Sequence, residues 1–279
     1  MVDKRSSDSN IDKKQSSAES AAAAVHSEDE PCRLCKEIKP LCRSHIIPEF
    51  FYKPMYDDQR RLLKISTAPE ERTLFKQKGI TEKLLCFECE QHINEFEKVT
   101  KRLFFDNFDY LETAHPNMIR IRNLDYDKVK LFQMSLLWRA GIANDLFFEN
   151  VNLGPHEERI RKMLLESNPG EPFDYGCIIV GLRTEEKIGF DVILKPERGR
   201  IGPYNCYQFI LGGCLWLFVV SNQAKHFQGN DRYLQADGTW LMESVPAKEV
   251  PLVIKMVQGL RKGGKLINPY KTLRDGTTE

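Results

Sequence analysis

Apolar residues recur at helical spacing along two stretches of the chain. In the first, which begins near Cys86, one helical face holds Ile93, Phe96 and Leu103, with polar residues between them. In the second, residues 127–143, so many positions are apolar that the helix must be covered on several sides. The pattern therefore predicts one amphipathic helix followed by one buried helix.

Turn residues punctuate the rest of the chain. Gly154-Pro155 predicts the start of another helix, because proline fits the first helical turn. Short apolar runs bounded by Gly and Pro predict strands, and a last helix is expected over 251–260. The expected strands cover residues 62–67, 73–76, 176–181, 189–194, 207–211 and 215–220. Separate runs of helices and strands predict an α+β fold.

Composition divides the chain into four parts. Residues 1–30 are rich in Ser, Ala and charge and have almost no large apolar residues, so a disordered tail is expected there. Residues 31–104 carry the paired cysteines and are expected to form one module. Residues 105–265, helical to about 170 and then rich in strands, are expected to form a larger domain without an assigned role. The basic end, 266–279, is expected to be a loose tail.

Charge and hydropathy exclude some classes of function. The 279 residues are 41% hydrophobic and carry a formal net charge of +1, so the whole molecule does not attract nucleic acid or membranes by charge. No apolar run reaches the length of about 18 residues that a membrane span needs. The N-terminus also lacks the apolar core of a secretion signal. A cytoplasmic protein without a membrane partner is expected.

Two C-x-x-C pairs are the strongest chemical signal. Cys32 with Cys35, and Cys86 with Cys89, can each chelate one ion from a tight turn, and four thiolates form a tetrahedral Zn²⁺ site. The second pair opens a helix, where the dipole favours thiolates. A reducing compartment argues against disulfides. The plain alternative is that these four cysteines are ordinary thiols that bind no metal.

A second zinc arrangement is open from spacing alone. Cys32, Cys35, Cys42 and His45 have C-x2-C-x6-C-x2-H spacing, which can close a local Cys₃His site but leaves the later pair unexplained. The three remaining cysteines lie in apolar stretches and are expected to be inert core residues: Cys177, Cys206 and Cys214.

Three segments resemble the HNH endonuclease superfamily: CRLC (32–35), SHIIP (44–48) and LLCFEC (84–89). The resemblance is limited to residues 31–104 and implies a treble-clef, or ββα-metal, zinc module. In that family a strand ends in His, followed by a hydrophobic residue and Pro, and the final C-x-x-C opens the helix. The whole chain resembles bacterial HNH-like proteins without a settled function.

The resemblance implies cleavage of DNA phosphodiester bonds. His45 corresponds to the general base, and Glu90 corresponds to a ligand of a separate catalytic Mg²⁺ or Mn²⁺, since a Cys₄ zinc has no open position. Asn94 shares a helical face with Glu90 and can assist it. The sequence departs from the family at Ser44, which stands where Asp or His is usual. It also has no Asn between residues 46 and 85.

Basic residues surround the first C-x-x-C pair, Cys32 and Cys35, and aromatic residues are interleaved with them. This combination fits a surface that binds nucleic acid. The basic residues are Arg33, Lys36, Lys39, Arg43 and Lys53, and the aromatic ones are Phe50, Phe51 and Tyr52. The plain alternative makes the aromatic residues core. The alternative function is a catalytically inactive zinc module that binds nucleic acid or a protein partner, and residues 105–265 can also supply a protein-binding surface.

Other candidates have plainer interpretations. Trp138-Arg139 has the composition of an interface, although such a Trp is more often core. The acidic residues of the amphipathic helix are expected to be solvated and paired with lysines, as in Glu97–Lys101. The isolated histidines are expected to be solvated loop residues: His26, His115, His156 and His226.

Overall fold

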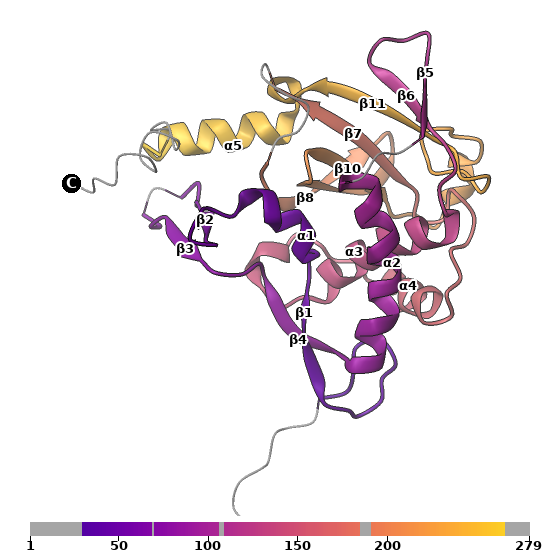
Figure 1. Cartoon of the computed structure of the whole chain (residues 1–279), viewed down its shortest axis with the longest axis horizontal. Helices are drawn as coiled ribbons and strands as arrows, with labels where there is room; N and C mark the ends of the chain where they lie inside the picture. The colour runs from indigo at the N-terminus through magenta and orange to yellow at the C-terminus, as the bar shows by residue number, and fades with distance from the viewer. Residues whose placement is uncertain (1–29, 69, 106–108, 185–190, 266–279) are drawn as a thin grey trace, which may run out of the picture.

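The computed structural model describes residues 30–68, 70–105, 109–184 and 191–265 (Figure 1). It has the predicted α+β architecture, with five α-helices and a seven-stranded sheet among the described residues. The tails expected at 1–30 and 266–279 lie outside the described residues, apart from Glu30. No helix in the described part of the chain is both long and apolar enough to cross a membrane.

The N-terminal segment, residues 30–105, contains a pair of antiparallel strands, called the β1–β4 hairpin below although a long connection joins them. The second of these strands leads directly into a helix. Strand β1 (Leu41–His45) pairs antiparallel with β4 (Thr81–Cys86), and α2 (Phe87–Phe105) follows β4 without a break. Between the two strands lie α1 (Glu49–Tyr52), the 3₁₀ turn η1 (Lys53–Met55), and a small sheet of β2 (Leu62–Lys64) and β3 (Leu74–Lys76). The strands expected at 62–67 and 73–76 are thus present but shorter.

The large sheet contains all the remaining strands: β5 (Tyr110–Glu112), β6 (Met118–Ile121), β7 (Cys177–Arg183), β8 (Leu194–Ile201), β9 (Tyr204–Leu211), β10 (Cys214–Val219) and β11 (Trp240–Pro246). Their spatial order is β5-β6-β11-β7-β10-β9-β8. Only the β11–β7 pair is parallel. The last strand of the chain therefore lies inside the sheet, between strands made much earlier.

Two sequence expectations for this region are wrong. Residues 105–170 were expected to be helical throughout, but they contain the β5–β6 hairpin. The strand expected at 189–194 begins only at Leu194; residues 191–193 are not strand, and 189–190 lie outside the described residues. Strand β8 is charged, contains Pro196 and has an irregular register, which are features of an edge strand without an apolar signal.

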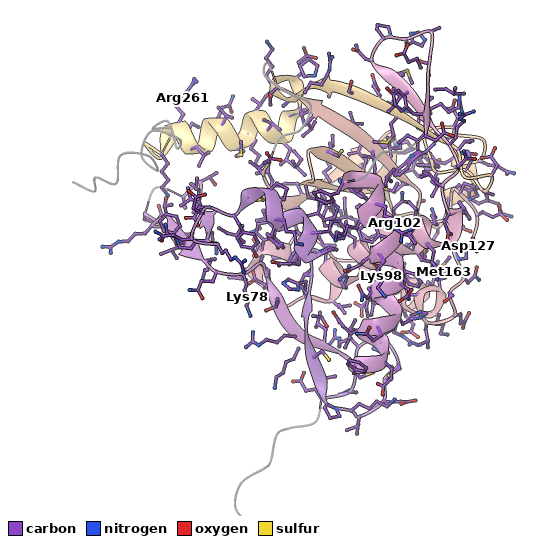
Figure 2. All side chains as sticks on the ribbon, in the orientation of Figure 1. Lys78, Lys98, Arg102, Asp127, Met163 and Arg261 are labelled. Carbon is purple, nitrogen blue, oxygen red and sulfur yellow. The ribbon has the colours of Figure 1, made fainter. Side chains whose placement is uncertain are left out.

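The three remaining helices begin near the predicted positions: α3 (Tyr126–Ile142), α4 (Pro155–Leu165) and α5 (Pro251–Lys262). Asp125 caps α3, because its carboxylate accepts a hydrogen bond from the Lys128 backbone N–H at 3.0 Å. Helix α3 is buried along nearly its whole length, as its apolar pattern predicted. By contrast, Lys98 and Arg102 are exposed on α2, which is amphipathic (Figure 2).

The N-terminal segment and the large sheet share a hydrophobic core. The rings of Phe51 and Phe104 lie with their centroids 6.0 Å and 5.5 Å from that of Trp216 on β10. Phe132 of the buried helix α3 lies 6.2 Å from the same indole. Trp216 therefore packs against side chains from three separate parts of the chain.

Candidate metal centre

The first cysteine pair lies on a tight turn. The backbone N–H of Lys36 donates to the carbonyl of Cys32 at 2.8 Å, and the N–H of Cys32 donates to the carbonyl of Glu37 at 2.9 Å. Lys36 adopts a left-handed conformation, with φ of 66°, which closes the turn. The turn aims both sulfurs to one side.

The second pair lies at the junction of a strand and a helix. Cys86 ends β4, and Cys89 lies in the first turn of α2. Two contacts dock the first turn on this junction: the N–H of Arg33 donates to the carbonyl of Leu84 at 2.9 Å, and the N–H of Cys86 donates to the sulfur of Cys32 at 3.3 Å. The backbone thus brings the two pairs together.

The four sulfur atoms form a compact cluster that can hold one metal ion. All four lie within 4.8 Å of one another, and those of Cys35 and Cys86 are 3.9 Å apart. Four ligands at about 2.3 Å from a tetrahedral ion are separated by about 3.8 Å, so the spacing fits. No disulfide links them. Cys42 and His45 are not part of this cluster, so the alternative Cys₃His site is not assembled.

The thiols have unequal acidities. Burial opposes ionisation of Cys32, but backbone N–H groups, that of Cys86 first, outweigh it and lower the pKa to about 7. Burial raises the pKa of Cys86 to about 11 and also raises that of Cys89. One thiol is thus ready to ionise near neutrality, while two others need a cation to lose their protons.

His45 is engaged by a carboxylate that the sequence analysis missed. Its Nε2 lies 2.9 Å from Oε2 of Glu49; both atoms are buried, and neither makes a hydrogen bond within the described residues. The Tyr56 hydroxyl donates to the other oxygen of Glu49 at 2.7 Å. The His45 side chain is 30% exposed. Glu49 follows His45 by four residues and begins α1, which turns its carboxylate back toward the ring. The close spacing in sequence was therefore a weak signal of this contact.

Ser44 and Glu90 meet on the other side of β1. The Ser44 hydroxyl is buried and donates to Oε2 of Glu90 at 2.6 Å. Ser44 stands where the resemblance led us to expect Asp or His, and Glu90 stands where it led us to expect a metal ligand. Successive strand residues point to opposite faces, so Ser44 faces α2 while His45 faces away from it. His45 pairs with Glu49, and Glu90 pairs with Ser44.

A buried arginine joins the end of β1 to two helices. Arg139 of α3 is 1% exposed; its Nη1 donates to the His45 carbonyl at 2.8 Å and lies 2.7 Å from Oε1 of Glu97 on α2. Glu97 was expected to pair with Lys101 on the surface, and that expectation is wrong. Trp138 and Arg139 are both core residues of this chain. Arg139 lies 94 residues from His45, so no sequence pattern signals the contact.

The predicted catalytic metal ligands do not form a cluster of their own. Among the described residues, the four cysteines form the only group of three or more His, Cys, Asp and Glu side chains close enough to share an ion. Glu90 and Asn94 are half-buried on α2. The structure thus assembles a four-sulfur site and leaves Glu90 as a single carboxylate beside the strand that carries His45.

The predicted nucleic-acid residues divide into two groups. Phe50, Phe51 and Tyr52 are buried core residues, as the plain alternative expected, so they are not available to stack on bases. Lys36, Arg43 and Lys53 are exposed, while Arg33 and Lys39 are half-buried. The Lys39 ammonium lies 2.7 Å from a carboxylate oxygen of Glu37 and 3.8 Å from one of Glu88. These two carboxylates partly cancel the positive charge that Lys39 would offer to a phosphate.

The cysteines and histidines elsewhere show mixed outcomes. Cys177, Cys206 and Cys214 are buried, as predicted. His156 is not a loop residue: it lies in the first turn of α4, and its Nδ1 is 3.1 Å from the Tyr175 hydroxyl. His226 lies in a 3₁₀ turn against the Tyr204 hydroxyl. His115 is exposed, and His26 lies outside the described residues.

Comparison with known protein families, curated proteins and solved structures found no match to this chain.

Proposed function

We propose that residues 31–104 form a zinc-bound treble-clef module of the HNH type, and that this module cleaves DNA with a divalent ion. The observation that carries the proposal is the hydrogen bond of 2.6 Å between Glu90 and Ser44, the residue that precedes His45 in β1. In the HNH pattern these two positions, one before the base and one after the last cysteine, hold the catalytic ion. The strand–strand–helix order of β1, β4 and α2 also agrees with this module.

The structural zinc is supported by the chemistry of its ligands. A cluster of four thiols without a disulfide matches the preference of Zn²⁺ for sulfur ligands and tetrahedral geometry. The ion joins the first turn to the start of α2. Its role is to hold β1 and α2 in fixed positions, and not to act on substrate.

The environment of His45 supports a role as a base. The Glu49 carboxylate lies 2.9 Å from Nε2 of the ring, so its negative charge can stabilise the imidazolium that forms when the base takes a proton. A partly exposed imidazole with a carboxylate beside it can take a proton from water. Glu49 thus orients the base, a role that the missing Asn would otherwise have.

Glu90 is the residue that would hold the catalytic ion. Mg²⁺ is commonly bound by one or two carboxylates together with substrate phosphates, and a carboxylate ligand is usually fixed by a second hydrogen bond. The Ser44 hydroxyl supplies that hydrogen bond. Such an ion would stabilise the negative charge that develops on the phosphate during cleavage.

A nicking assay tests the proposal. Purified protein is expected to nick supercoiled plasmid with Mg²⁺ or Mn²⁺ and not in EDTA. His45→Ala is expected to slow nicking by a factor of about 10² or more while keeping one zinc per chain. His115→Ala, which changes an exposed histidine outside the module, is the matched control and keeps full activity. Equal nicking by wild type and His45→Ala would rule out the proposed base.

A non-catalytic binding module is the second candidate function. Arg139 and Glu97 favour it, because a buried cation–carboxylate pair already bridges the end of β1 and α2. In that case the protein binds DNA or a protein partner and shows no turnover with any divalent ion. Zinc-loaded protein that binds DNA tightly but never nicks it, in several metals, would establish this candidate and exclude the first.

A further inference from the structure

One face of the β1–β4 strand pair carries two exposed basic residues. In its register Arg43 lies opposite Lys83, and His45 lies opposite Thr81. Residues that are directly opposite, or two apart on one strand, point to the same side of the sheet. These four residues, Arg43, His45, Thr81 and Lys83, are called the outer hairpin face below.

The opposite face of the hairpin is fully used by internal contacts. Ser44 donates to Glu90, as described above. Glu82, which lies opposite Ser44, accepts hydrogen bonds from the backbone N–H groups of Asn144 and Asp145 at 2.8–3.0 Å. These contacts fix which side of the hairpin faces the protein. Arg43 and Lys83 lie on the other side, the outer hairpin face, and both are exposed.

The outer hairpin face carries two like charges directly opposite each other. Arg43 and Lys83 are both exposed, and like charges at opposite positions of a strand pair are destabilising. The hydrogen bond of Arg43 within the described residues goes to a neutral group, the Thr81 hydroxyl at 3.5 Å. Neither cation has a carboxylate partner in the part of the chain that the structure describes.

The Glu49 carboxylate is occupied by other groups. One of its oxygens accepts a hydrogen bond from the Tyr56 hydroxyl, and the other lies 2.9 Å from Nε2 of His45. The outer hairpin face thus keeps two positive charges on neighbouring strands, on the same side of the sheet as the imidazole. An anion bound between the two cations would remove their repulsion.

We propose that Arg43 and Lys83 together bind one phosphate of a DNA backbone beside His45. This inference rests on the proposed function and specifies how its substrate is held. Side chains at opposite strand positions have Cβ atoms about 5 Å apart, so both cations can reach one phosphate. Arginine supplies paired N–H donors, and lysine supplies a mobile point charge. Lys83 was absent from the set of basic residues that the sequence suggested.

A binding assay without turnover tests the inference. Zinc-loaded full-length protein is titrated into a fluorescein-labelled DNA duplex in the presence of a mild Mg²⁺ chelator that leaves the zinc bound, across a range of salt concentrations. Arg43→Gln and Lys83→Gln are each expected to weaken binding by about fivefold to tenfold. Each is also expected to reduce the slope of log affinity against log salt by about one. Lys225→Gln, which removes an exposed lysine from a 3₁₀ turn that follows β10, is the matched control and leaves both quantities unchanged.

The possible outcomes separate this inference from the proposed function. Unchanged affinity and slope in both variants, with one zinc per chain retained, would overturn the phosphate site, and so would an equal loss in the Lys225→Gln control. Binding to heparin or to an acidic protein but not to DNA would also overturn it. Binding that depends on Arg43 and Lys83, in a protein that never nicks DNA, would support the site and refute only the nuclease.

Discussion

Lys130 is a basic residue on α3 whose side chain is buried in the protein. Its side chain is 1% exposed, and its ammonium donates to the carbonyls of Pro172 and Tyr175 at 3.1 Å and 3.3 Å. Burial lowers the pKa of Lys130 from 10.5 to about 8. Two neutral carbonyls stabilise the ammonium less than water does, so the charged form is held at a cost to stability.

This residue gives a prediction about pH. Between about pH 8 and 10.5 the unfolded chain keeps the Lys130 proton while the folded chain has released it, so this residue makes stability rise with pH across that window. Below pH 8 both states are charged, and the cost is constant at about 3 kcal/mol. Lys130→Met is therefore expected to unfold at higher urea concentration than wild type at pH 7.

The measurement is urea unfolding of wild type and Lys130→Met at pH 7, 8, 9 and 10. The stability difference is expected to be largest at pH 7 and to shrink as the pH approaches 10.5. A difference that stays constant over this range would show that the pKa of Lys130 is not lowered in the folded state.

Residues near the site differ in how far the sequence could predict them. The four cysteines were predictable, because a C-x-x-C pair chelates locally and two pairs complete one tetrahedral ion. Glu49 lies four residues after His45, but only the turn into α1 shows that it reaches the ring. Arg139 approaches His45 from a helix 94 residues away, and only the packed structure reveals such a contact.

At the scale of elements, the cysteine cluster joins two pieces that are far apart in sequence. The turn that carries Cys32 and Cys35 meets the junction of β4 and α2 at the four sulfurs and through two hydrogen bonds of the backbone. A metal that binds only the folded site contributes its binding free energy to the stability of that site. Removal of the ion is therefore expected to loosen this end of the molecule first.

Two cysteine variants test this expectation. Cys86→Ser is expected to lose nearly all bound zinc and to increase hydrogen exchange in β1, β4 and the first turn of α2. Cys42→Ser changes a nearby cysteine outside the cluster and is expected to keep one zinc per chain. Metal analysis together with hydrogen exchange measures both effects. Loss of zinc from Cys42→Ser would instead favour the Cys₃His site.

Elements with a strong apolar period were predicted close to their observed bounds, whereas charged or short ones were not. Helices α2, α3, α4 and α5 have clear periodicity or a Pro start, and all four are present. Strand β5 has all three residues exposed, and β8 is an edge strand with a proline. Their pairing partners define them as strands, and pairing is a property of the whole sheet.

At the scale of the whole molecule, Trp216 links the N-terminal segment to the sheet. Trp216→Ala is expected to lower the free energy of unfolding by about 3–5 kcal/mol, because the indole is fully buried among aromatic rings. Trp216→Phe keeps an aromatic ring and is expected to cost less. Since both parts lose contacts, the segment and the sheet are expected to unfold together.

Two probes followed in the same urea titration check this prediction. Fluorescence of the remaining tryptophans, Trp138 and Trp240, reports on α3 and the sheet, and zinc release to a coloured chelator reports on the cysteine cluster. Coincident midpoints are expected for wild type and for both variants. Zinc release well before the fluorescence change would show that the segment unfolds independently.

The position of β11 has a consequence for synthesis on the ribosome. Residues 240–246 are the last of the described strands to emerge, yet they lie between β6 and β7, inside the sheet. Until they emerge, the β5–β6 hairpin and the four strands from β7 to β10 have no partner between them, and each presents an open edge. The nascent chain must keep both edges from pairing with other molecules, which is the kind of intermediate that chaperones bind.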